Sequence, residues 1–284
     1  MKFLFIFISI IFLYAEEIST ISKSFPALIK EYKNKQTQQN VKQLFSRDFS
    51  LYPYQANYFL PVTWDFNKKL DRREFESKFQ ISIMKPFGFN LLNKNELYFF
   101  TYTQLSLWQT SAPSGPFRES NYEPEIAVLF PTEEYHKNWD GVLFALNHQS
   151  NGRDVPYSRS WNRFYTKFLF HYSDIIFNLR VWYRIPEPKK KYPNDPDGDD
   201  NPDIEDYLGY GDFKIIYPYK DHLITTLLRY NPTTKKGAFQ IDYSKPIRGK
   251  DIFLYIQYFR GYGESLIDYK TFVNKIGIGF EYSR

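Results

Sequence analysis

Apolar and polar residues alternate along most of this chain, and no other feature constrains its fold as strongly. In the segment 74–83, Phe, Ser, Phe, Ile and Ile at the odd positions face Glu, Glu, Lys, Gln and Ser at the even ones. Segments 252–258 and 275–282 show the same period of two. Successive side chains of a β-strand point to opposite faces, so each segment predicts a strand with one apolar face. Turn-forming Asn, Asp, Gly and Pro residues between the segments indicate antiparallel strands throughout.

Composition separates two classes of β-protein. Aromatic residues make up 20% of the chain, yet its mean hydropathy is -0.52. Aromatic strands that are apolar on one side only, joined by polar turns, are typical of bacterial outer-membrane barrels. We therefore predict an all-β fold, an antiparallel transmembrane β-barrel of about 12 strands. A secreted β-sandwich is the alternative.

The connections between strands also suit a barrel. Long polar segments at 110–124 and 186–206 read as outer loops, and shorter turns are expected near Pro232 and Pro246. Long outer loops with tight periplasmic turns are usual in such barrels. No run after residue 15 is long enough to form a membrane helix. The basic residues form no clustered stripe, so nucleic acid is not an expected partner.

The start of the chain predicts its compartment. One lysine is followed by an apolar run from Phe3 to Tyr14 and then by the small residue Ala15. This pattern indicates a secretory signal peptide over residues 1–15. We expect a polar periplasmic segment over 16–45 and the barrel domain over 46–284. The chain has no cysteine, so its stability cannot come from disulfides.

The segment NHQSNGRDVPYSRSWNRFY carries the candidate chemistry. His148 and Ser150 are two residues apart and would share one face of a strand. If the flanking strands pair antiparallel about Val155, Asn162 lies opposite His148. A hydroxyl nucleophile, an imidazole base and an amide that orients the base would then be adjacent, which is the logic of a Ser-His-acid triad with a neutral third member.

The face that holds these three residues is apolar. It carries Phe144 and Leu146 on the first strand and Phe164 and Phe168 on the second, while Arg163 is on the opposite face. In a sandwich this stripe would be the core, and substrate would need a cleft to reach it. In a membrane barrel the stripe faces lipid, and the three residues would meet lipid directly.

Several blocks of the chain resemble the outer-membrane phospholipase A family. They are NHQSNGRDVPYSRSWNR, YTQLSLWQ from Tyr102, PFRESNYEPE from Pro116, DDNPDIEDYLGY from Asp199 and GYGESLIDY from Gly261. The resemblance implies a twelve-stranded barrel in the outer membrane that hydrolyses phospholipid acyl esters at either glycerol position (A1 and A2), with lysophospholipase side activity. By position in the motif, Ser150 is the nucleophile, His148 the general base and Asn162 the residue that holds the imidazole in its productive tautomer.

The family resemblance also implies a calcium ion and a homodimer. By similarity, Ser158 supplies a side-chain oxygen to Ca²⁺, Arg153 its carbonyl oxygen, and Ser114 of the partner subunit completes the site. The amide of Gly152 is expected as an oxyanion donor. Gln104, on an aromatic outer stripe, would hydrogen-bond across the subunit interface, because a lone amide facing lipid is costly.

Other interpretations stay open at this stage. A non-catalytic porin or adhesin barrel that kept the motif would conduct ions whether or not Ser150 is intact. A soluble secreted serine esterase is a third possibility, but it leaves the phenylalanines beside the site without a role. The acidic run Asp195–Asp206 resembles a calcium loop, and we interpret it as a solvated outer loop.

Overall fold

The computed structural model describes residues 51–67, 73–132, 138–192, 195–248 and 252–283. The segments expected to be a signal peptide (1–15) and a polar lead-in (16–45) lie outside the described residues.

Long antiparallel strands account for most of the described chain. The strands are β1 (Tyr52–Pro53), β2 (Asn57–Asp65), β3 (Phe75–Phe89), β4 (Leu97–Trp108), β5 (Phe117–Pro131), β6 (Trp139–Ser150), β7 (Ser160–Tyr172), β8 (Ile175–Ile185), β9 (Gly211–Tyr219), β10 (His222–Asn231), β11 (Lys236–Arg248), β12 (Ile252–Gly261) and β13 (Val273–Ser283). One short helix, α3 (Ile204–Leu208), precedes β9.

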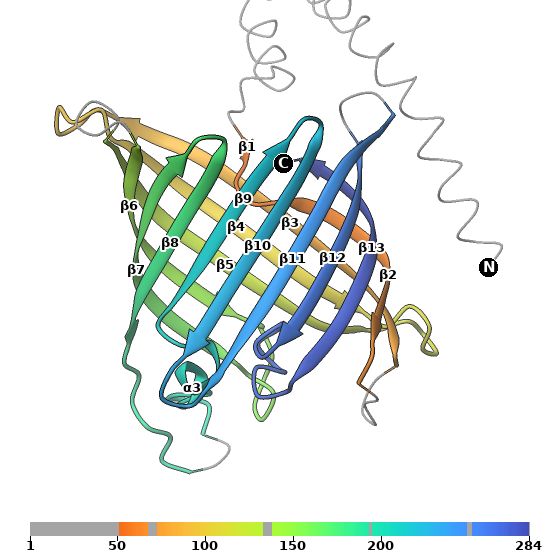
Figure 1. The fold of residues 1–284 in the computed structure, drawn as a ribbon. Coiled ribbons are helices and arrows are strands. Elements are labelled where there is room, and N and C mark those ends of the chain that lie inside the picture. Colours follow the sequence, from red (N-terminus) through yellow and green to blue (C-terminus); the bar gives the residue numbers. More distant parts are fainter. Residues whose placement is uncertain (1–50, 68–72, 133–137, 193–194, 249–251, 284) are drawn as a thin grey trace, which may run out of the picture. The chain divides into compact units, whose positions relative to one another are not determined.

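The sheet closes on itself. Each strand from β2 to β13 pairs antiparallel with its neighbours in sequence, and β13 pairs with β2 to complete a barrel of twelve strands (Figure 1). The two-residue strand β1 pairs with β3. The predicted barrel is thus confirmed and the alternative of a β-sandwich is wrong. Among the described residues there is no helix of the length and hydropathy that a membrane crossing requires.

Consecutive hairpins place every second connection at the same end of the barrel. The connections after β4, β6, β8, β10 and β12 therefore share one end, where Figure 1 shows α3. These include the segments that hold Ser114, Ser158 and the acidic run, so candidate site residues far apart in sequence lie at the same end of the barrel.

Two boundaries differ from the sequence expectation. The loop expected over 110–124 ends earlier, because β5 starts at Phe117 and Asn121 pairs with Leu105 of β4. The turn expected near Pro246 falls later in the chain, because β11 runs through Pro246 to Arg248 and β12 begins at Ile252. A shift in register between Pro246 and Arg248 accommodates the proline, which lacks the amide that a regular ladder needs.

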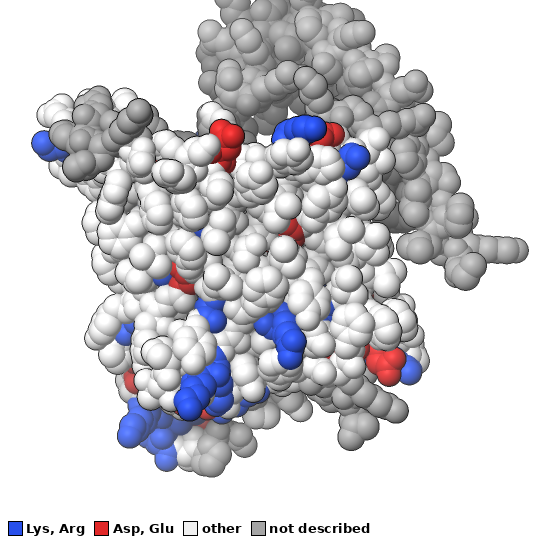
Figure 2. Space-filling view, viewed as in Figure 1, with Lys and Arg blue, Asp and Glu red and all other residues white. Residues whose placement is uncertain are grey.

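The barrel wall is apolar outside. Trp64, Phe100, Ile126 and Val181 are among the large apolar side chains that stay exposed on the outer face. Figure 2 shows that most of the visible wall carries no charged side chain and that the largest groups of Lys and Arg lie at its lower end. Such a band is what a lipid-facing wall requires.

The lumen holds a network of buried charges. Lys275 Nζ lies 2.6 Å from both Glu76 Oε1 and Glu264 Oε2, and Arg118 Nε lies 2.9 Å from Glu76 Oε2. Arg118 also pairs with Asp268. Glu264 and Asp268 belong to the connection after β12, so this connection folds into the barrel and is fastened to the wall by ion pairs.

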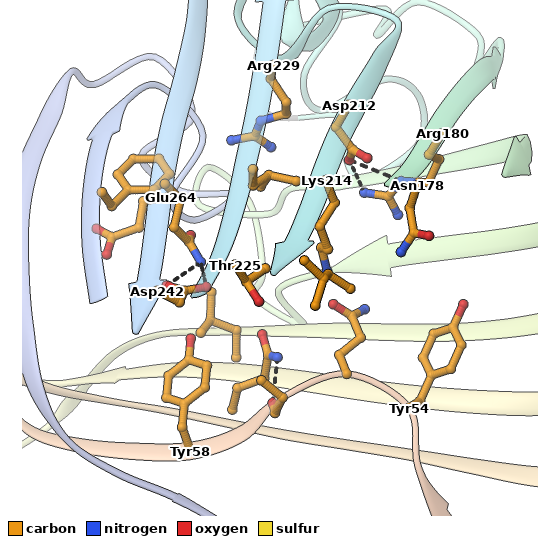
Figure 3. A pocket seen from close by; sticks show the side chains of 18 of the residues that line it. Tyr54, Tyr58, Asn178, Arg180, Asp212, Lys214, Thr225, Arg229, Asp242 and Glu264 are labelled. Carbon is orange, nitrogen blue, oxygen red and sulfur yellow. Dashed lines mark hydrogen bonds and ion pairs between the residues drawn. The ribbon is translucent and has the colours of Figure 1, made fainter. Parts of the chain in front are cut away.

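A cavity of about 700 Å³ remains in the lumen. Figure 3 shows its polar lining, where Arg180 contacts Asp212 and Lys214 and Asn178 point toward the open space. His148, Ser150 and Asn162 do not line this cavity. This cavity is therefore separate from the candidate chemistry.

Candidate active site on the outer wall

The β6–β7 hairpin has the register that the sequence predicted. His148 pairs with Asn162, and Ser150 pairs with Ser160. Both pairs fall at the rim end of the hairpin, because β6 ends at Ser150 and β7 begins at Ser160.

Alternate residues of this hairpin point into the lumen and to the exterior, as expected. Asn147 and Arg163 point inward and are buried. Phe144, Leu146 and Phe164 are 37%, 52% and 41% exposed on the outer face. The candidate catalytic residues continue this outer face, so they lie at the edge of the apolar band, where acyl chains and polar headgroups meet.

A hydrogen bond joins two of the three residues. His148 Nδ1 lies 2.9 Å from Asn162 Oδ1. Since an amide oxygen only accepts, Nδ1 carries the proton and the lone pair of Nε2 is left to accept one. Ser150 stands two residues from His148 on the same face, and the described hydrogen bonds include none between its hydroxyl and the ring. Catalytic hydrogen bonds are commonly long before substrate binds.

The other side of the Asn162 amide contacts a residue that sequence reasoning missed. Asn162 Nδ2 donates to Glu187 Oε1 at 3.0 Å. Glu187 follows β8, whose last residue, Ile185, pairs with Asn162. That register was the available signal, since a residue two positions past Ile185 extends the same face. Burial raises the pKa of Glu187 above its ordinary value, the carboxylates of Asp199 and Asp200 add to the rise, and the Asn162 hydrogen bond and the Arg184 charge oppose it.

The turn after Ser150 is organised by a buried asparagine. Asn151 Oδ1 accepts from the Arg159 amide at 2.9 Å, and Asn151 Nδ2 donates to the Tyr157 carbonyl at 2.9 Å. Gly152 has a φ of +62°, and a Cβ there would lie 3.3 Å from the Tyr122 ring. None of the described hydrogen bonds uses the Gly152 amide, which leaves it able to donate to a ligand beside Ser150.

The expected calcium ligands are only partly assembled in one chain. The Ser158 hydroxyl donates to the Asp200 carboxylate, and the Arg153 guanidinium lies 3.5 Å from Glu119 Oε2. Ser114 lies in the connection between β4 and β5, with no described contact to either. The described part of the chain gathers no cluster of three or more acidic, His or Cys residues that could hold a metal.

The acidic segment differs from the solvated loop that we expected. Asp195 and Asn201 are buried, and Asn201 Oδ1 accepts from the Ser160 amide at 3.0 Å. Asp199 pairs with Arg184 at 2.6 Å, and Asp200 with Lys190 at 2.5 Å. The segment thus folds over the end of the β6–β7 hairpin, because its carboxylates and amides have partners there.

Gln104 lies half-buried on β4, as its parity predicted. Its Oε1 accepts from the Tyr102 hydroxyl at 3.0 Å, and its Nε2 donates to Ser106 Oγ at 3.1 Å. Neighbours within the chain therefore satisfy part of the amide, and none of the described hydrogen bonds uses its second N–H.

Comparisons with known proteins agree with this architecture. The family model for phospholipase A1 matches residues 33–282. The phospholipase A1 of Escherichia coli K12 is 37% identical over 253 residues, which covers 84% of each chain. A putative phospholipase A1 of Neisseria meningitidis is 38% identical over 220 residues, covering 75% of this chain and 56% of the relative.

Solved structures of outer membrane phospholipases also superpose on this chain. The outer membrane phospholipase A of Escherichia coli superposes with a TM-score of 0.74 at 35% identity, covering 82% of this chain and 94% of that one. The Salmonella typhi outer membrane phospholipase, a dimer with bound calcium, gives a TM-score of 0.75 at 35% identity, with coverages of 84% and 93%.

Proposed function

Because the chain belongs to the phospholipase A1 family, we propose that it hydrolyses phospholipid acyl esters in the outer membrane with Ser150 as its nucleophile. One observation carries the proposal: the His148–Asn162 hydrogen bond lies beside Ser150 on the lipid-facing side of the wall. Export would use residues 1–15 as a signal peptide, with residues 16–45 forming a polar segment before the barrel.

The chemistry follows from the orientation of His148. Nε2 accepts the Ser150 proton as Oγ attacks the ester carbonyl carbon, and the imidazolium then gives that proton to the departing glycerol oxygen. Water, deprotonated by the same nitrogen, releases the fatty acid from the acyl-enzyme and restores Ser150. The Gly152 amide donates to the oxyanion that forms in each half of the reaction.

The third residue suits the location. Asn162 fixes the imidazole without placing a carboxylate directly on the lipid-facing strand, where charge is unfavourable. As its oxygen accepts from Nδ1, it holds the imidazole in the tautomer that the first step requires.

A calcium ion fits the residues at the rim. Ser158 offers a hydroxyl oxygen next to the Asp200 carboxylate, and Arg153 offers its carbonyl. Hydroxyl, carbonyl and carboxylate oxygens are the ligands that calcium takes. We assign Ser158, Arg153 and Ser114 of the partner subunit to this ion, which when bound supplies positive charge beside the developing oxyanion. The calcium-bound dimer of the Salmonella relative supports the assignment.

A homodimer follows from the same reasoning. One chain alone does not bring Ser114 to Ser158, and Gln104 keeps an N–H on the outer face for a second copy. Association within the membrane would pair the two Gln104 amides, where an unpaired donor is costly. A non-catalytic porin is disfavoured because buried ion pairs fasten the connection after β12 inside the lumen.

The test is ester hydrolysis by refolded protein in phospholipid–detergent micelles, with calcium and with chelator. We expect activity that needs both calcium and Ser150, so Ser150→Ala is inactive under either condition. Ser160→Ala is the matched control, since Ser160 stands opposite Ser150 on the same face and its amide contact with Asn201 survives the change. Wild-type protein that is folded, dimeric and inactive with calcium would refute the proposal.

A further inference from the structure

We propose that Glu187 is a positioning residue for the catalytic hairpin, whose carboxylate holds the Asn162 amide with its oxygen toward His148. The inference rests on the proposed function and deepens it, because it names what keeps the third residue in its productive orientation. The contacts form a linear chain, with Glu187 Oε1 3.0 Å from Asn162 Nδ2 and Asn162 Oδ1 2.9 Å from His148 Nδ1.

An asparagine alone does not determine its own orientation. The two ends of its amide have nearly the same shape, so a half-turn about the terminal bond exchanges an acceptor for a donor. If Nδ2 of Asn162 faced His148, the ring would have to accept at Nδ1 and carry its proton on Nε2. Ser150 would then have no base, because a protonated Nε2 cannot accept its proton.

A carboxylate removes this ambiguity because it has no proton to donate. An ionised Glu187 accepts only from Nδ2, so it selects the orientation in which Oδ1 of Asn162 faces His148. A hydrogen bond to an ionised acceptor is stronger than one between neutral groups. The preference is therefore passed on to the tautomer of His148.

The fold places this charge where it is tolerated. β8 ends at Ile185, which pairs with Asn162, and Glu187 lies two residues beyond it, outside the strand and half-buried. The Asn162 side-chain amide thus links His148 on the apolar wall to Glu187 at the polar rim.

Arg184, whose charge acts on Glu187, forms its own hydrogen bonds with other groups. The Arg184 guanidinium donates to Asp199 Oδ1 at 2.6 Å and to the Pro202 carbonyl at 3.2 Å. Among the described residues, the hydrogen bond recorded for the Glu187 carboxylate is the one from Asn162. The carboxylate is thus committed to the catalytic amide rather than to an ion pair.

The experiment measures kcat and KM separately for Glu187→Ala, Glu187→Gln and wild type, in calcium-saturated micelles. We expect kcat to fall roughly 5- to 20-fold in Glu187→Ala with little change in KM, as for loss of one hydrogen bond to a charged group. Glu187→Gln should fall between the two, because it keeps an acceptor but brings a donor of its own.

A double-mutant cycle with Asn162→Ala separates positioning from general damage. If Glu187 acts through Asn162, adding Glu187→Ala to Asn162→Ala costs no further activity. Glu205→Ala is the matched control: it removes another half-buried carboxylate between β8 and β9, one with no hydrogen bond to its side chain among the described contacts. The control should retain wild-type kcat.

Two results would overturn the inference while the wild type remains active. They are a kcat for Glu187→Ala within twofold of wild type, and fully additive losses in the double mutant. An inactive wild type would instead defeat the proposed function and the inference with it. The rate at which a sulfonyl fluoride modifies Ser150 provides a second readout, and it should fall in parallel with kcat.

Discussion

The inner and outer faces of the β6–β7 hairpin differ in how their polar side chains are partnered. Inside, Arg163 Nε donates to Asn147 Oδ1 at 2.9 Å and its NH2 group lies 2.9 Å from Glu123. Outside, His148 and Asn162 share one hydrogen bond at 2.9 Å. The inner charged groups have partners on neighbouring strands, whereas the outer polar groups have hydrogen-bonding atoms that no described contact uses.

The difference shows that the role of a side chain depends on whether it faces the lumen or the lipid. A buried charge must find its partner within the protein, so the inner residues are committed to structure. The outer face has no Lys, Arg, Asp or Glu at positions 148, 150 and 162, so these side chains can stand beside lipid while the Ser150 hydroxyl and the Nε2 atom of His148 remain available to a substrate. Four predictions test this division, in order of expected effect.

The largest effect is expected from the outer face. His148→Ala removes the proposed general base, so kcat should fall by about three orders of magnitude or more, while the unfolding free energy stays close to that of wild type. Phospholipid hydrolysis and urea unfolding of the same preparations measure the two quantities. Marked destabilisation with retained activity would reverse the assignment of the two faces.

On the inner face we expect a substitution to lower the unfolding free energy. Arg163→Met leaves Glu123 with the hydrogen bond from Asn147 but without its charged partner in the lumen, and we expect the unfolding free energy to drop by about 3–5 kcal/mol. Adding Glu123→Gln should restore part of this loss, because the uncompensated charge is gone. Equilibrium unfolding in lipid vesicles gives the values, and equal stability of all three proteins would contradict the argument.

Lipid exposure of the outer face predicts a third, somewhat smaller effect. Phe144 is 37% exposed midway along β6, so Phe144→Arg should cost about 2–4 kcal/mol of unfolding free energy in vesicles. Phe144→Leu is the matched control and should cost under about 1 kcal/mol. If arginine were tolerated as well as leucine, this part of the wall would face water.

The smallest effect concerns Glu187. Since its pKa is raised in the folded protein, its contribution to stability is present at pH values below the ordinary glutamate pKa and is lost as pH rises through the folded pKa. Wild type should therefore lose stability relative to Glu187→Gln on going from acidic to neutral pH. Because the side chain is only half-buried, this shift should be the least of the four. Unfolding of both proteins across that range measures it, and a rise with pH would contradict the sign.

Local patterns predicted what depends on strand parity. The facing of His148 and Asn162 followed from counting residues about Val155, and the structure has that register. Parity also predicted that Gln104 points outward. Such features are predictable because a strand alternates its side chains whatever its neighbours are.

Features that depend on residues distant in the chain could not be predicted from the sequence. Pro246 reads as a turn, but pairing with β12 keeps it in a strand. The charges of the acidic run suggested solvent exposure, yet Asn201 is buried against the Ser160 amide. Glu187 was overlooked because only the β7–β8 register places it next to Asn162.

The seam between β2 and β13 has a consequence for the order of folding. The His148–Asn162 hydrogen bond joins residues 14 positions apart, whereas the ion pair that Lys275 of β13 makes across the seam with Glu76 of β3 joins residues 199 apart. Contacts of such high contact order form slowly, because the intervening chain must lose its freedom before they contribute. The barrel cannot close until β13 has been synthesised and delivered, so the unfolded chain has to be kept from aggregating for the whole of its passage to the membrane.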